Sequence, residues 1–291
     1  MSINISDHAN LVSAAHLSER KNVVEPKEVP EAKAESDEDA EPKKVKAKKA
    51  SVPKEQHASV PKEKAKAKKD AQYKTEDTGK QFEMAICLAY ETNFDGKYKY
   101  SMEIPEILKQ RLDKLRELIP KCIHTAKKGS RYDFTSPTTH LSAKSTKKGV
   151  GKVAPQVVGQ AQPKKFCEII GIPYTTNTEL KEYIQTNILS LLPVLVNYTF
   201  DCPNIYYNQE KNTIRFITLI KTIEWDKYKF KWTCNWNEWN NSSTLKVIVD
   251  EKEVALLEFQ IHSKTRTNMA IRWCYENFLS IFNQNLCIIH M

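Results

Sequence analysis

The 291-residue chain carries a formal net charge of +9, and 40% of its residues are hydrophobic. Length alone leaves one large domain or two small ones open. The basic balance favours a polyanionic partner, of which nucleic acid is the commonest. The seven cysteines are scattered and form no CxxC pair, which argues against a disulfide framework and a structural zinc site.

No targeting or membrane segment is expected. The start, MSINISDHANLVSAAHLSERK, lacks a charged stretch followed by an apolar run, so we expect no signal peptide. No apolar run approaches the ~18 residues of a membrane span. The sequence therefore predicts a soluble, intracellular protein in the cytoplasm. Nuclear import is the alternative if the lysine-rich N-terminal segment is a targeting signal.

Residues 1–75 are expected to be a disordered, charged, lysine-rich tail. Residues 25–41 are mainly acidic and residues 43–69 mainly basic, and no aromatic residue precedes Tyr73. Such a segment cannot bury enough apolar area to offset its ordering entropy. A non-specific DNA tether or import signal and a plain solubilising tail remain alternative interpretations of the lysines.

Two helices are predicted at the start of the folded body, which we place at residues 76–291. Residues 79–91 carry an apolar stripe at helical spacing, with Glu83 beside it. Residues 104–118 repeat that pattern, and Pro105 suits a first helical turn.

The next elements alternate between strands and helices. Two short strands, at 131–135 and 140–145, should be joined by a turn at Ser136 and Pro137. The remaining expectations are helices at 164–170 and 179–196, an antiparallel meander over 205–262, and a helix over 268–282. Helices on both sides of such strands predict an α/β or α+β fold.

Strand alternation places Asp133, Ser142 and Lys144 on one face of the predicted hairpin. A carboxylate on one strand and a lysine on the next form an arrangement suited to phosphodiester hydrolysis. The carboxylate would hold Mg²⁺, which prefers oxygen ligands and retains waters. The lysine would orient the attacking water and stabilise developing charge. An ordinary cross-strand ion pair is the alternative.

A single carboxylate is normally too few for such a metal site. Glu83 is the preferred second ligand, because an acid beside an apolar helical stripe must face something polar. Glu258 is the rival, since it belongs to the polar face of an alternating strand. A solvated helix residue and the polar face of a half-buried strand are the ordinary alternatives for these two acids.

Four segments carry a resemblance to a known family, namely GKQFE, RYDFT, LSAKST and GKVAPQVVGQ in that order. Their order is similar to that of PD-(D/E)xK type II restriction endonucleases, in the branch where Ser-x-Lys replaces the second acid of the motif. The resemblance implies a mixed sheet flanked by helices. It also implies a catalytic core at about 80–170, followed by recognition and dimerisation elements at about 171–291.

The same resemblance assigns roles to individual residues. It makes Asp133 a metal ligand, Lys144 the motif lysine and Ser142 the substituted acid position, with Glu83 supplying the missing acid. Two features depart from the pattern: Tyr132 stands where proline is usual, and Ser142 leaves the site short of a carboxylate.

Two loops and a glutamine pair are candidates for contacts with DNA. Phosphate contacts suit lysines in a glycine-containing loop, and Arg and Asn read base edges by geometry. The candidates are Lys147, Lys148, Lys152, Gln156, Gln160, Lys264, Arg266 and Asn268. A solvated basic loop and a charged helix N-terminus are the ordinary alternatives.

The resulting expectation is a Mg²⁺-dependent, sequence-specific endonuclease that hydrolyses phosphodiester bonds of double-stranded DNA, that is, a type II site-specific deoxyribonuclease. Cutting both strands of a palindrome favours a homodimer. The alternatives are a DNA repair or recombination nuclease and a non-catalytic DNA-binding protein.

Overall fold

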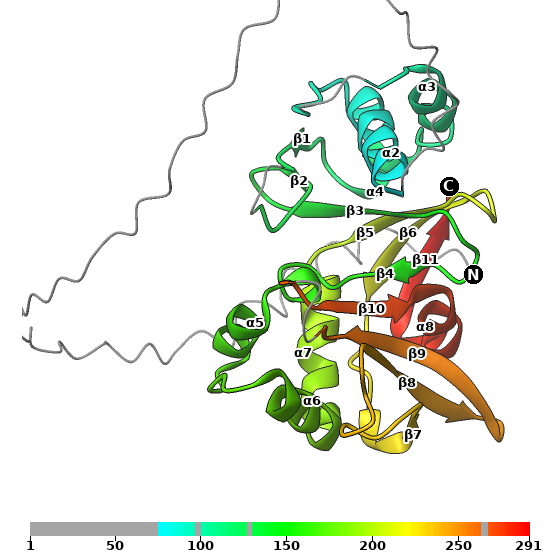
Figure 1. Cartoon of the computed structure of the whole chain (residues 1–291). Helices are drawn as coiled ribbons and strands as arrows, with labels where there is room; N and C mark the ends of the chain where they lie inside the picture. Colours follow the sequence, from blue (N-terminus) through cyan, green and yellow to red (C-terminus); the bar gives the residue numbers. More distant parts are fainter. Residues whose placement is uncertain (1–74, 97–99, 127–129, 263–266) are drawn as a thin grey trace, which may run out of the picture. The chain divides into compact units, whose positions relative to one another are not determined.

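Two β-sheets with helices packed against them make up the part of the chain that the computed structural model describes, residues 75–96, 100–126, 130–262 and 267–291 (Figure 1). The predicted α+β class, with a mixed sheet flanked by helices, is confirmed. The tail predicted over residues 1–75 lies, except for Thr75, outside the described residues. All described elements belong to one unit, Gln72–Met291.

The larger sheet has six strands in the order β1-β2-β3-β5-β6-β11. Strands β3 and β5 are parallel, and the other neighbouring pairs are antiparallel. The strands are β1 (Ile123–His124), β2 (Phe134–Thr135), β3 (His140–Thr146), β5 (Asn204–Asn208), β6 (Thr213–Leu219) and β11 (Leu286–His290). A parallel pair needs a long crossover connection, and here the connection carries a strand and three helices.

The smaller sheet has five antiparallel strands in the order β4-β10-β9-β8-β7. Its strands are β4 (Lys152–Val153), β7 (Lys229–Trp232), β8 (Ser242–Val249), β9 (Lys252–Gln260) and β10 (Ala270–Cys274). Because β4 follows β3 directly, the chain passes from one sheet to the other through the short segment 147–151.

Gly151 at the end of this passage is required by its backbone and by its neighbours. Its φ of 58° is in the left-handed region, and a Cβ there would lie 2.2 Å from the Tyr206 hydroxyl. Its carbonyl accepts a 2.7 Å hydrogen bond from the Tyr275 amide of α8 (Tyr275–Ile281). The turn thus ties β3, β5 and α8 together.

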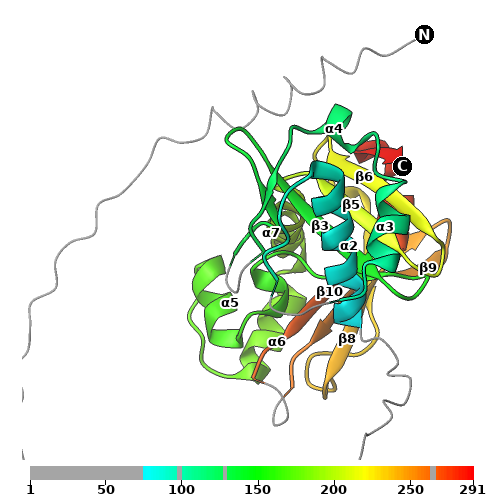
Figure 2. The same ribbon diagram turned by 90° about the horizontal axis from the view of Figure 1, so that it is seen from above.

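The two faces of the six-stranded sheet bury different cores. Helix α2 (Thr75–Tyr90) covers one face, where Phe82 packs in a cluster with Leu141 of β3 and Ile205 of β5 (Figures 1 and 2). Tyr206 points the other way and joins the larger core, which includes residues of α7 (Ile188–Phe200) and of the second sheet. Each fully buried large apolar side chain contributes roughly 1.5–3 kcal/mol, so both faces stabilise the fold.

The helix predicted over 79–91 is confirmed as α2, but the one predicted over 104–118 is broken into α3 (Glu103–Lys109) and α4 (Leu115–Leu118). Between them the amides of Arg111 and Leu112 bond to carbonyls three residues back, at 3.0 and 2.9 Å. The Asp113 carboxylate accepts a bond from the next amide. Local polar competition of this kind ends regular helix.

The later helices begin and end where local signals place them. The expected helix at 164–170 is confirmed as α5 (Pro163–Ile170), whereas the one at 179–196 is divided at Asn187 into α6 (Asn177–Thr186) and α7. The Thr176 hydroxyl caps α6 by accepting a 3.2 Å bond from the Glu179 amide.

Two predictions for the C-terminal half were wrong in part. The meander expected over 205–262 holds only for β7, β8 and β9, because β5 and β6 join the other sheet. The helix expected over 268–282 begins only at Tyr275, after strand β10. Buried Ile271 and Trp273 alternate with less buried neighbours there, and that period of two suits a strand.

A polar network around Glu276 of α8 connects the two halves of the fold. The carboxylate accepts 3.0 Å hydrogen bonds from Asn208 of β5 and from Lys211, and it pairs with Arg215 of β6. Burial acts to raise the pKa of Glu276, but these partners hold it below the ordinary value of 4.5.

All seven cysteines are free, as the sequence predicted, and five of them are buried. Burial is the main reason that the pKa values of Cys87 and Cys202 rise to about 12. Within the described part of the chain, no helix combines the length and apolar character needed to cross a membrane.

Candidate active site

Asp133 lies immediately before β2, where the chain meets the middle of β3. Its Oδ2 accepts two hydrogen bonds, 3.0 Å from the Ser142 hydroxyl and 2.8 Å from the Ala143 amide. Ser142 is fully buried, and its own amide donates to the Pro203 carbonyl at 3.0 Å. Hydrogen bonds to a charged group are stronger than neutral ones, so β3 holds this carboxylate in a defined position.

Lys144 follows Ser142 by two residues on β3 and is partly buried. Leu141 and Ala143 belong to the cluster under α2, so Ser142 and Lys144 face the opposite side, as strand alternation predicted. Burial and the charge of Asp201 raise the pKa of the Cys202 thiol, and the charges of Lys144 and Asp133 also affect it. These charged groups therefore gather around Cys202, just before β5.

The segment before Asp133 departs from a regular strand. The chain bends at Arg131 and at Asp133, and the Tyr132 ring stacks on His140 with centroids 4.0 Å apart. The Arg131 guanidinium lies 5.0 Å from the Tyr198 ring centroid and donates a 2.7 Å bond to Asp201. The expected strand at 131–135 is therefore shortened, and Tyr132 does not share the Phe134 face.

Asp201 is the residue at this site that sequence reasoning missed. It is the C-terminal cap of α7, and its side chain is 5% exposed. Burial, the Asp201 charge and a hydrogen bond with that carboxylate raise the pKa of Tyr132 to about 12. An acid that directly follows a long apolar helical stretch was the available signal.

Glu83 lies on the other side of the sheet from Lys144. Both of its oxygens accept bonds from Lys80, at 2.8 and 2.7 Å, and one lies 3.0 Å from the His124 Nε2. The Asp95 amide donates to the His124 Nδ1, so Nε2 carries the proton and donates to Glu83. None of the described contacts joins Glu83 to Asp133.

Glu258 is held within the five-stranded sheet. Its carboxylate accepts bonds from Lys152 at 2.8 Å and from Arg272 at 3.1 and 2.8 Å. Burial acts to raise the pKa of Glu258, but these two partners hold it below its ordinary value. The described contacts bring neither Glu258 nor Lys152 to Asp133.

The two glutamines of the resemblance have different surroundings. Gln156 is buried: its backbone amide donates to the Tyr198 carbonyl at 2.8 Å, and its Nε2 lies 3.7 Å from the Cys202 sulfur. Gln160 is exposed at the end of a 3-10 turn, Val158–Gln160. Only Gln156 therefore lies beside the Asp133 and Lys144 face.

The remaining candidates for DNA contact lie at chain reversals. Lys148 is exposed and Lys147 partly buried in the segment joining the two sheets. Asn268 is exposed just before strand β10, where a helix start was expected, whereas Lys264 and Arg266 lie outside the described residues.

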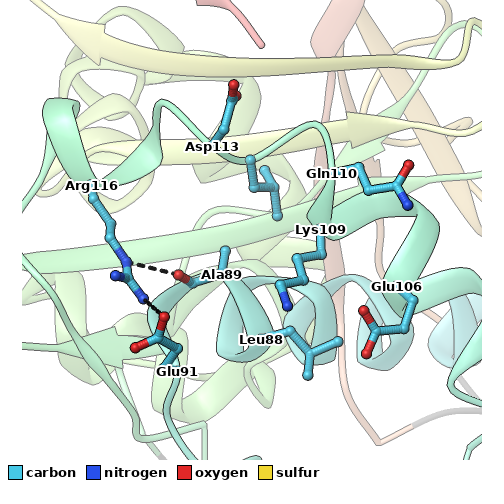
Figure 3. Close-up of a pocket in the computed structure, with 9 residues that line it drawn as sticks. Leu88, Ala89, Glu91, Glu106, Lys109, Gln110, Asp113 and Arg116 are labelled. Carbon is cyan, nitrogen blue, oxygen red and sulfur yellow. Dashed lines mark hydrogen bonds and ion pairs between the residues drawn. The ribbon is translucent and has the colours of Figure 1, made fainter.

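A separate hollow lies beside α2, α3 and α4 (Figure 3). Arg116 at its edge donates to the Ala89 carbonyl at 2.8 Å and pairs with Glu91 at 3.0 Å. Glu106 and Asp113 also line it. Its two bases, Lys109 and Arg116, are outnumbered by its three acids, so the hollow offers no concentration of positive charge for a nucleic-acid substrate.

The candidate ligand atoms around Asp133 fit a hard cation. They are carboxylate and amide oxygens, the ligand type that Mg²⁺ prefers. Among the described residues, no three His, Cys, Asp or Glu side chains form a ready metal cluster. A cation here would therefore keep several waters, as Mg²⁺ commonly does.

Comparison with known proteins identifies a curated relative. The chain is 41% identical over 215 residues to the type II restriction enzyme CviAII of Paramecium bursaria Chlorella virus 1. The aligned part is 72% of this chain and 61% of that enzyme, so the chain spans less than two thirds of its relative. No family model matches the chain, and no solved structure matches it. The chain is thus similar, over most of its own length, to a type II restriction enzyme.

Proposed function

We propose that this protein is a type II site-specific deoxyribonuclease that hydrolyses phosphodiester bonds of double-stranded DNA with Mg²⁺. The observation that carries the proposal is the placement of Asp133 against Ser142 and Ala143, on the strand that bears Lys144. The similarity to CviAII supports the same reaction class.

The chemistry follows from the charges of these side chains. When bound, Mg²⁺ supplies polarisation of the scissile phosphate and acidification of a bound water. Asp133 would be one ligand through Oδ1, the oxygen that does not accept the Ser142 and Ala143 bonds. The Lys144 ammonium orients the attacking water and offsets the negative charge that develops on the phosphate. Ser142 keeps the Asp133 carboxylate in place.

The second metal ligand is the open position of this site. Glu83 and Glu258 were the sequence candidates, and each accepts hydrogen bonds from two basic or imidazole side chains. Either acid would have to exchange those partners for the cation. Glu83 would also have to act from the opposite face of the six-stranded sheet.

DNA is held, in this proposal, by the basic chain reversals. Lys147, Lys148 and Lys152 contact phosphates, and Gln160 is a further candidate for such a contact. Base contacts come from the segment of Lys264, Arg266 and Asn268. A homodimer brings two such sites to the two strands of a palindrome.

A cleavage assay with variants tests the proposal. Wild-type protein incubated with phage-length duplex DNA and Mg²⁺ should yield discrete fragments, and Asp133→Ala should yield none. Asp226→Ala, which removes an exposed acid far along the chain, is the matched control and should cut like wild type.

Two other classes of protein would give different results in that assay. A smear, or cutting confined to branched DNA, would indicate a repair or recombination nuclease. DNA binding without any cleavage that depends on Asp133 would make the protein a non-catalytic DNA-binding protein.

A further inference from the structure

Asp201 is a buried carboxylate with one open oxygen. Its Oδ2 accepts the 2.7 Å bond from Arg131, and the Tyr132 hydroxyl also acts on the carboxylate, whereas Oδ1 is buried and has no hydrogen-bond partner with standard geometry among the described residues. The residue also caps the C-terminus of α7, where the helix dipole disfavours negative charge. Burial and the helix end both penalise this charge, and an unpaired buried acceptor adds a desolvation cost.

Two amide oxygens near Asp201 are also buried acceptors without a described hydrogen-bond partner. Gln156 Oε1 and Asn204 Oδ1 are buried and have no hydrogen-bond partner in the part of the chain that the structure describes. Their nitrogens are engaged, since Asn204 donates to the Thr199 carbonyl at 2.8 Å and Gln156 lies 3.7 Å from the Cys202 sulfur. The amide orientation thus leaves oxygens as the open atoms. Three unpartnered acceptors and no donor form a set suited to a cation.

These acceptors lie beside the Asp133 site. Asn204 pairs with Ser142 across the parallel strands, and the Ser142 hydroxyl binds Asp133. Arg131, two residues before Asp133, binds Asp201 at 2.7 Å, and the Gln156 Nε2 lies 3.7 Å from the sulfur of Cys202, the residue after Asp201. Asn204 and Ser142 belong to the face of the sheet away from α2, the face that Lys144 occupies.

We infer that Asp201 supplies the second carboxylate of the cation site that Asp133 begins, through its unpartnered Oδ1 and with the Gln156 amide oxygen as a neutral ligand. The inference rests on the proposed function and names the ligand that Glu83 and Glu258 were expected to provide. Arg131 holds the other Asp201 oxygen and keeps the carboxylate oriented. Oxygen donors of this kind select a hard divalent cation.

The alternative role for Asp201 is purely structural, as the anchor of Arg131 and Tyr132. The two roles predict different effects of a second variant, Arg131→Met, on cation uptake. If Asp201 only anchors Arg131, removing either partner should have the same effect on cation uptake. If Asp201 is a ligand, Arg131→Met should keep its carboxylate available, whereas Asp201→Asn should remove the charge.

The test measures uptake of Mn²⁺, a paramagnetic stand-in for Mg²⁺, by the full-length protein through the electron paramagnetic resonance signal of free Mn²⁺. Asp201→Asn should weaken uptake at least tenfold, as should Asp133→Asn. Arg131→Met, which leaves the Asp201 carboxylate in place without this partner, should weaken uptake less than Asp201→Asn does, and the surface control Asp226→Asn should remain within twofold of wild type. Thermal unfolding of each variant checks that the fold is retained.

The outcomes separate this inference from the proposed function. Uptake by Asp201→Asn equal to wild type, or equal losses in Asp201→Asn and Arg131→Met, would overturn the role of Asp201. Wild-type protein that takes up no Mn²⁺, with or without duplex DNA, would also overturn it. DNA cleavage that depends on Asp133 is measured separately and would still support the nuclease.

Discussion

Replacing Ser142 with alanine removes one of the two hydrogen bonds that hold the Asp133 carboxylate. The hydroxyl is fully buried and donates to Oδ2 at 3.0 Å. A hydrogen bond to a charged group contributes about 1.5–3 kcal/mol. The Ala143 amide remains at 2.8 Å, so we expect a loss of about 1.5–2 kcal/mol of unfolding free energy, at the lower end of that range.

A double-mutant cycle isolates this interaction from other effects of the substitution. Urea unfolding at pH 7 would be measured for Ser142→Ala, Asp133→Asn and the double variant. Side chains in direct contact show coupling energies of about 0.5–3 kcal/mol, and we expect at least about 1 kcal/mol here. Coupling that is indistinguishable from zero would show that Ser142 does not hold Asp133.

The same geometry predicts the effect of restoring an acid at this position. Ser142→Asp would place a second carboxylate in a buried site against Asp133, and a like charge disfavours the ionised form. We expect Ser142→Asp to be less stable than Ser142→Ala at pH 7, in the same urea experiment. A more stable Ser142→Asp would show that the site holds a cation strongly enough to compensate for the repulsion.

Three further changes test other parts of the structure. Lys144→Ala should keep DNA binding in a gel-shift assay while cleavage falls at least ~100-fold, the scale of one lost electrostatic contact to the transition state; unchanged turnover would mean that the active site lies elsewhere. Gly151→Ala should lose about 1–3 kcal/mol because of its positive φ and its approach to Tyr206, and an unfolding midpoint equal to wild type would contradict this. Glu258 and Glu276 have pKa values held below 4.5 in the fold, so the stability they contribute is present above that pH and is lost as the pH falls below it. Replacing both with glutamine should flatten the acid side of the curve of unfolding free energy against pH. An unchanged acid side would refute the role of these two carboxylates in stability.

Local patterns were enough to predict several elements. The apolar spacing of α2 and the alternation of β3 each arise from neighbouring residues, and the structure confirms both elements. Where local patterns were ambiguous, the prediction was wrong. The run over Ala270–Cys274 contains apolar residues that suit a helix or a strand, and pairing with β4 and β9 makes it a strand.

The sequence by itself determined that Ser142 and Lys144 share one face, because strand alternation depends only on adjacent residues. Asp133 lies in a bend before β2 and is joined to that face by its hydrogen bond with Ser142. Tertiary structure alone decided what surrounds them. The packing of α2 places Glu83 on the opposite face of the sheet, and the parallel pairing of β3 with β5 brings Asn204 beside Ser142. Such contacts depend on which surfaces of distant elements bury each other, and no local period encodes that choice.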